Sequence, residues 1–205
     1  MRTLLVLVAV SCAAFAQHHK IDEVDSEKPE GKLLQQIMQE PDTAKRTPML
    51  EQFAKEFPKH EGTGWALEQL LAQAVKAGQP DAIITAGDRL LAFDPECPEG
   101  GLQSLKAAQT KKDVALIKKY SAITAAAAQK MPAAEAESAK YYLGNADFVL
   151  FSMAAESRDP KLTIELAEAL RGQSPKGDYF TKVAPPLFVA YQQSGDKAKA
   201  TALAE

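Results

Sequence analysis

ALEQLLAQAVKAGQPDAIITAGDRLLAFDP, residues 66–95, predicts two short antiparallel helices. Leu67 and Leu71 are four residues apart, a spacing that places side chains on one face of a helix. Gly78 tolerates the positive φ typical of a helix end, and Pro80 suits the first turn of the helix that follows. Two helices of this size bury too little apolar surface to fold alone. The pair therefore needs further helices packed on both sides.

Apolar residues with the same spacing recur over the rest of the chain. They predict helices over residues 32–39, 49–57, 102–110, 114–130, 133–156 and 160–171, with a last pair that starts near residue 180 and turns at 194–196. No stretch alternates apolar and polar residues as a half-buried strand does. We therefore expect an all-α domain over residues 32–205.

Self-comparison shows an internal repeat. A shift of 80 residues superimposes Leu70 on Leu150, Leu71 on Phe151, Ala74 on Ala154, Leu90 on Leu170 and Pro95 on Pro175. A further shift of 37 residues carries Leu150 onto Leu187, and Gly78 lies 117 residues before Gly195. A helical pair repeated at such a period is typical of a solenoid, in which each unit contacts only its neighbours.

At these positions the chain resembles the tetratricopeptide repeat (TPR) family over most of residues 32–205. In the last unit, the family's leucine, tyrosine, glycine, acidic residue and alanine are matched by Leu187, Tyr191, Gly195, Asp196 and Ala200. The chain departs from the family pattern where a small residue is usual, with Leu71, Phe151 and Phe188 in that place. The resemblance implies a right-handed α-solenoid of about four to five stacked antiparallel helix pairs, with Tyr191 buried between helices.

The resemblance also implies a partner-binding surface, because TPR proteins hold peptides in a concave groove lined by the first helix of each pair. Carried over residue by residue, the predicted surface consists of Trp65, Glu68, Lys76, Asn145, Phe148, Ser152, Lys182, Val189 and Gln192. The only tryptophan, Trp65, is either an aromatic anchor for a partner or a cap on the local core. As a group, the neighbouring aromatic residues Tyr141, Tyr142, Phe148 and Phe151 are interpreted as core rather than as a ligand cage.

The N-terminal residues 1–16 predict a signal peptide. An apolar run from Leu4 to Val10 follows Arg2, and Ala14-Phe15-Ala16 provides the small residues that precede a cleavage site. We favour cleavage before Gln17, which predicts an exported protein of the periplasm or cell envelope. A rival cleavage before Cys12 would leave a lipidated cysteine, and only then do we expect membrane contact.

After cleavage before Gln17, residues 17–31 form a polar segment that we expect to be a solvated, disordered, acidic leader. The mature chain has 23 basic residues against 27 acidic ones, a net charge of −4, which argues against nucleic acid as a partner. Cys97 is its only cysteine, so no internal disulfide can form. We interpret Cys97 as a small side chain in a turn.

Candidate chemistry is sparse. No hydrolase, paired-cysteine or phosphate-loop motif is present, so we expect no enzymatic activity, no cofactor and no metal site. An N-terminal Gln17-His18-His19 could offer four nitrogens to copper(II) or nickel(II), although two histidines in a solvated leader are the simpler interpretation. The sequence therefore favours an exported scaffold that binds a protein or peptide. The alternative is a structural subunit of an envelope assembly, anchored through lipidated Cys12.

Overall fold

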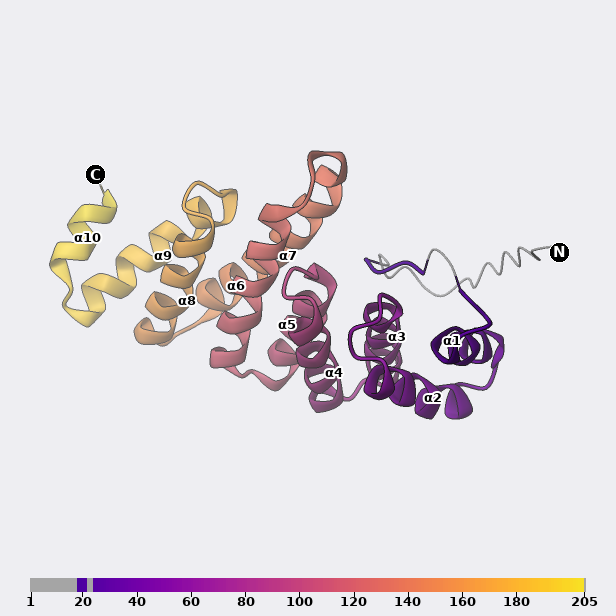
Figure 1. Cartoon of the computed structure of the whole chain (residues 1–205). Helices are drawn as coiled ribbons and strands as arrows, with labels where there is room; N and C mark the ends of the chain where they lie inside the picture. Colours follow the sequence, from indigo (N-terminus) through magenta and orange to yellow (C-terminus); the bar gives the residue numbers. More distant parts are fainter. Residues whose placement is uncertain (1–17, 22–23, 205) are drawn as a thin grey trace.

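The computed structural model describes residues 18–21 and 24–204, and this part of the chain is all-α (Figure 1). Its ten α-helices are α1 Pro29–Gln39, α2 Thr43–Glu56, α3 Gly62–Ala77, α4 Pro80–Phe93, α5 Pro98–Lys111, α6 Val114–Lys130, α7 Ala136–Glu156, α8 Pro160–Gln173, α9 Asp178–Ser194 and α10 Lys197–Ala204. A 3-10 turn, η1 Ala133–Glu135, precedes α7. None of the described helices combines the length and the apolar character that a bilayer crossing requires. The predicted signal peptide and both candidate cleavage sites lie outside the described residues.

The central pair forms as predicted. Helix α3 ends at Gly78, whose φ of 68° is left-handed and whose N–H donates to the carbonyl of Ala74 at 3.1 Å. Pro80 is the first residue of α4, where its missing N–H costs no helical hydrogen bond. Gly195 ends α9 in the same way, with a φ of 80°. Two glycines of the internal repeat thus adopt the positive φ that the pattern requires.

Side-chain caps explain where several helices begin. Backbone N–H groups donate to the carboxylates of Asp42, Asp113 and Asp159 at the starts of α2, α6 and α8. The cap at Asp42 starts α2 at Thr43, earlier than the predicted residue 49, and Pro48 lies inside the helix. Helix α6 begins and ends at the predicted residues.

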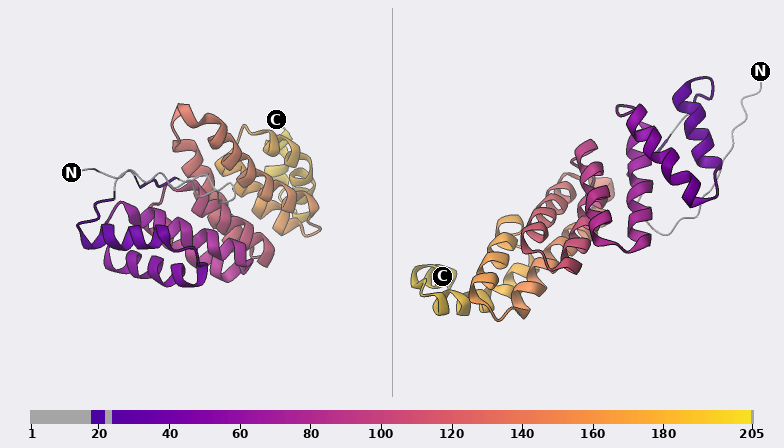
Figure 2. Two further views of the ribbon diagram at one scale, coloured as in Figure 1. Left: turned by 90° about the vertical axis from the view of Figure 1, so that its right-hand side faces the viewer. Right: turned by 90° about the horizontal axis from the view of Figure 1, so that it is seen from below.

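The helices pack sequentially, each against the next along the chain (Figure 1). Contacts also join alternate helices, namely α3 with α5, α5 with α7, α7 with α9, and α6 with α8. Helices α1 and α10 lie at opposite ends of the molecule, which is elongated along the row (Figure 2). An architecture of this kind presents an extended face to solvent.

Apolar side chains form two main clusters in the described residues. One lies among α1 to α4 and includes Phe53 and Leu71; the other centres on α5 to α9 and includes Tyr120 and Leu150. Tyr191 belongs to the second cluster and is 1% exposed, which confirms that it is buried. The repeated leucines therefore face the interior, as the periodicity predicted.

The segment before α1 differs from the expected solvated leader. Ile21 and Val24 pack against the first apolar cluster. His19 reaches α3 and the end of α4, where its ring lies edge-on to Phe93 at 5.7 Å between centroids. The acidic composition of the segment predicts solvation, but its few apolar residues and His19 find partners on the folded helices.

Candidate functional site

Exposed aromatic side chains gather where α7 packs beside α9. Tyr141 is 54% exposed and Phe148 is 47% exposed, both on α7. Tyr179, in the first turn of α9, is half-buried, and its ring meets that of Phe148 edge-to-face at 5.7 Å between centroids. We call Tyr141, Phe148 and Tyr179 the aromatic patch. Aromatic rings on an open surface offer a large apolar contact area to a partner.

A shallow hollow of about 390 Å³ lies over the aromatic patch. It is lined by Glu137, Lys140, Tyr141, Gly144, Asn145, Phe148 and Tyr179. Gly144 helps to open it, since a Cβ at this position would meet nothing within 4 Å. The Nζ of Lys182 lies 5.2 Å from the centroid of the Tyr179 ring. The hollow thus combines an apolar floor with charged and amide groups.

The structure brings together only part of the predicted partner-binding surface. Asn145 and Phe148 line the hollow, and Lys182 lies over one of its rings. Val189 and Gln192 are exposed further along α9, and Ser152 is half-buried on α7. Trp65, Glu68 and Lys76 lie on α3, outside this site, with Trp65 partly buried against the first apolar cluster and Lys76 exposed.

The interpretation of the neighbouring aromatic residues as core is correct for some of them and wrong for others. Tyr142 is 3% exposed, and its hydroxyl donates to Oε2 of Glu99 at 2.9 Å. Tyr141 and Phe148 instead point to solvent. Tyr179 was not predicted as a site residue, because a single tyrosine at the start of a helix carries no spacing signal of its own.

Glu68 lies beneath the segment that precedes α1 rather than on an open groove. Only 8% of this residue is exposed. Its Oε1 accepts the backbone N–H groups of His18 and His19, each at 3.1 Å, and lies 2.8 Å from Nδ1 of His19. Glu68 is therefore covered by residues 18 and 19 of the same chain, whereas Lys76 on the same helix is exposed.

A cluster of titratable groups, separate from the aromatic patch, surrounds His19. Its Nε2 lies 3.2 Å from Oδ2 of Asp94, and the hydrogen bond with Glu68 is the main reason why its pKa is raised. Cys97 is fully buried, and burial raises the pKa of its thiol to about 12. One ligand atom from each of His19, Glu68 and Cys97 lies within 4.8 Å of the others, so these residues could hold a metal ion. Their wide spacing matches no metal motif, which is why sequence reasoning missed them.

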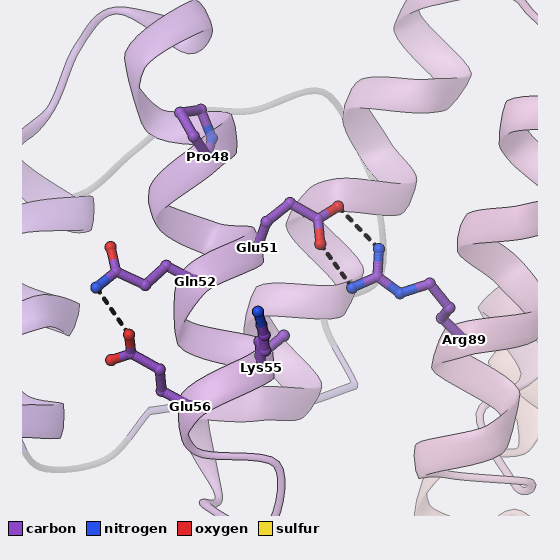
Figure 3. Close-up of a pocket in the computed structure, with 7 residues that line it drawn as sticks. Pro48, Glu51, Gln52, Lys55, Glu56 and Arg89 are labelled. Carbon is purple, nitrogen blue, oxygen red and sulfur yellow. Dashed lines mark hydrogen bonds and ion pairs between the residues drawn. The ribbon is translucent and has the colours of Figure 1, made fainter.

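A larger hollow of about 530 Å³ lies between α2 and α4 (Figure 3). There the guanidinium of Arg89 donates two hydrogen bonds to the carboxylate of Glu51, at 2.8 and 2.7 Å. Gln52 donates to Glu56 beside it at 3.1 Å. The polar groups here hydrogen-bond to one another and are not free to bind a ligand in the hollow. We therefore interpret this surface as a contact that joins α2 to α4.

Asp147, next to Phe148, anchors α7 to the end of α8. Its Oδ1 accepts hydrogen bonds from Nε2 of Gln173 at 2.7 Å and Oγ of Ser174 at 3.0 Å. Burial nevertheless raises the pKa of this carboxyl above its ordinary value of 3.8. The charged form is thus disfavoured in the native state.

We expect Asp147→Asn to raise the free energy of unfolding at pH 7. A carboxyl whose pKa is higher in the native state than in the unfolded state loses stability as pH rises through the native value. Asparagine keeps the Oδ1 acceptor and removes the buried charge, so the gain should shrink as pH falls below 3.8, where the carboxyl becomes neutral in the unfolded state as well as in the native state. Urea unfolding of both proteins across this range measures the difference. A variant that is less stable than the wild type at pH 7 would contradict this account.

Comparisons of the chain with protein-family models, with curated proteins and with solved structures found no significant match. The TPR resemblance thus rests on the positions in the repeat and stays a prediction. What the structure adds is a sequentially packed all-α chain with an exposed aromatic patch on α7 and α9.

Proposed function

We propose that this chain is an exported interaction scaffold that binds a protein or peptide. In this proposal the helices form a right-handed, TPR-like α-solenoid, and the partner lies along its first helices, α3, α5, α7 and α9. The aromatic patch is the observation that carries the proposal. Tyr141 and Phe148 are among the few large apolar side chains left exposed in the described residues, and they lie together with Tyr179. Clusters of this kind mark interaction sites because their burial by a partner is favourable.

The packing of alternate helices supports a concave face on the first helices. Contacts join α3 with α5, α5 with α7 and α7 with α9, and they are fewest between α3 and α5; among the second helices they join α6 with α8. When the first helices of successive pairs pack more closely than the second helices, the stack of pairs curves toward the first helices. The aromatic patch, which lies on α7 and α9, would then be on the inner side of the curve.

The segment before α1 supports peptide binding along the same row. Glu68 of α3 accepts two successive backbone N–H groups, from His18 and His19. These two contacts recognise the main chain, and the His19 ring adds a side-chain contact through Nδ1, 2.8 Å from Oε1 of Glu68. Glu68, at one end of the row, is therefore already covered by residues 18 and 19, and the patch at the other end is open to a partner.

The sequence bears on the compartment, and the aromatic patch bears on the class of partner. The proposed export is based on the predicted signal peptide, residues 1–16. The net negative charge of the mature chain argues against nucleic acid, whose phosphate backbone is also negative. The patch favours a partner with an apolar or aromatic anchor, and Lys140 and Lys182 beside it favour a carboxylate near that anchor.

Peptides selected from a displayed random library against the full chain test this proposal. We expect Phe148→Ser to weaken the selected peptides about 30-fold, the equivalent of about 2 kcal/mol for loss of an interface anchor. The matched control is Met38→Ser on α1, which also removes an exposed apolar side chain, 38% exposed in the native protein. Affinities measured by fluorescence anisotropy should be unchanged in the control.

Thermal unfolding of both variants separates a binding defect from misfolding, because exposed positions away from special contacts change stability little. The proposal fails if the peptides bind the Phe148→Ser protein as tightly as the wild type. It also fails if Met38→Ser weakens them equally, since the peptides would then bind exposed apolar side chains without selectivity.

A further inference from the structure

We infer that His19, Glu68 and Cys97 form a binding site for a zinc-like divalent ion, a property independent of the proposed peptide binding. One ligand atom from each residue lies within 4.8 Å of the other two. The residues come from three parts of the chain: the segment before α1, helix α3, and the turn before α5. Bonds of about 2.0–2.3 Å to a tetrahedral ion place its ligand atoms roughly 3.5 Å apart, so small side-chain rotations would close the site.

Glu68 carries one buried oxygen that has no hydrogen-bond partner. The Oε1 atom of Glu68 accepts hydrogen bonds from the histidine segment, but its Oε2 is buried and has no hydrogen-bond partner. In the described part of the chain, no lysine or arginine lies within ion-pair distance of this carboxylate, and its charged partner is His19. A buried, half-satisfied carboxylate is costly. An ion at this position would satisfy it.

Cys97 is placed to bind as a thiolate. It is the N-cap residue of α5, so its side chain lies at the N-terminus of that helix. Helix N-termini stabilise thiolates. Burial and the carboxylates of Glu68 and Asp94 oppose ionisation while no cation is present. A coordinated ion reverses that balance and displaces the thiol proton.

Asp94 supplies the outer contact that metal-binding histidines usually have. The Nδ1 atom of His19 faces Glu68, while Nε2 lies 3.2 Å from Oδ2 of Asp94. If Nδ1 binds the ion, the Nε2–H group donates to this carboxylate, which fixes the ring orientation and strengthens the ligand. Asp94 therefore acts as a positioning residue.

Gly64 of α3 leaves room for the His19 ring. A Cβ at Gly64 would lie 2.3 Å from Cδ2 of His19, so the ring occupies the space that the missing side chain leaves. His19 is thus held close to Glu68 and Cys97 by packing as well as by hydrogen bonds.

The donor set indicates the class of ion. Imidazole nitrogen, thiolate sulfur and carboxylate oxygen are the three ligand types that zinc takes in proteins. Calcium and magnesium prefer oxygen alone, and the thiolate disfavours them. Three protein ligands leave a fourth position for water. A bound ion would fasten residues 18–19 to α3 and the start of α5, so it would stabilise this end of the molecule.

Titration of the reduced mature chain, residues 17–205, with Co²⁺, followed by displacement with Zn²⁺, tests the site. We expect one equivalent of Co²⁺ to produce a thiolate-to-cobalt charge-transfer band in the near ultraviolet, and Zn²⁺ to abolish the band and raise Tm. Cys97→Ser should remove the band. Asp94→Asn should keep it and weaken Zn²⁺ about 10- to 100-fold in competition with a chromophoric chelator, as loss of an outer contact does.

Two further variants make the test specific. Gly64→Ala keeps all three ligands but displaces the His19 ring, so it should weaken Zn²⁺ binding as well. His60→Gln removes a histidine whose Nδ1 accepts the N–H of Gly62 at 3.0 Å, outside the cluster, and should leave the affinity unchanged. Thermal melts without metal show whether each variant folds.

The inference is overturned if Co²⁺ gives no stoichiometric charge-transfer band. It is also overturned if Zn²⁺ binding and the Tm shift persist in folded Cys97→Ser and Gly64→Ala proteins. The latter result would place the ion elsewhere, for example on the nitrogens of an N-terminal Gln17-His18-His19.

Discussion

Tyr191→Ala is expected to lower the free energy of unfolding by about 3–5 kcal/mol, the range for truncation of a large buried side chain. Tyr191 lies on α9 in the second apolar cluster and is 1% exposed. Its hydroxyl donates to a carboxylate oxygen of Glu168 on α8, and burial raises the pKa of the phenol. Alanine would therefore leave a cavity and remove a contact between neighbouring helices.

Urea unfolding followed by circular dichroism measures this loss. Tyr191→Phe removes only the hydroxyl and should cost about 1 kcal/mol, which separates the hydrogen bond from the ring. Tyr141→Ala, at a residue that is 54% exposed, is the matched control and should change stability by less than about 0.5 kcal/mol. A loss under about 1 kcal/mol for Tyr191→Ala would show that the register of the last repeat is wrong.

Glycine-to-alanine substitutions at Gly101 and Gly144 should have opposite effects on stability. A Cβ at Gly101 of α5 would lie 2.6 Å from Oγ1 of Thr124 and 3.2 Å from its backbone nitrogen on α6. The helices must separate to admit it, at a cost of about 1–3 kcal/mol. A Cβ at Gly144 of α7 meets nothing within 4 Å, so alanine there should stabilise by about 0.5–1 kcal/mol.

Chemical denaturation of the Gly101→Ala and Gly144→Ala proteins tests both predictions. Both positions lie within helices, so helix propensity favours alanine at each, and only the contact with α6 distinguishes them. Equal stabilisation of both proteins would contradict the close approach of α5 and α6.

Local features of the fold could be predicted from the chain itself. Helix α6 lies over the predicted residues, and Gly78 and Gly195 end their helices with positive φ. The start of α2 was predicted too late, because the apolar spacing begins at Met49, whereas the cap at Asp42 starts the helix at Thr43. Caps and turns act over three or four residues, so the sequence carries this information directly.

The candidate sites were less accessible to sequence reasoning. The TPR resemblance selected Asn145 and Phe148, and both line the hollow over the aromatic patch. It also selected Glu68, which the segment before α1 covers. Tyr179 joins the aromatic patch only because α9 packs beside α7.

By itself, the sequence determined that this protein is a chain of helices, where most of them end, and which leucines face the interior. Hydrogen bonds and side-chain contacts between residues three or four positions apart are enough for that. Only the tertiary structure decided which aromatic rings stay exposed and that His19 meets Glu68 and Cys97. These residues are far apart along the chain, and their proximity depends on how all the intervening helices pack.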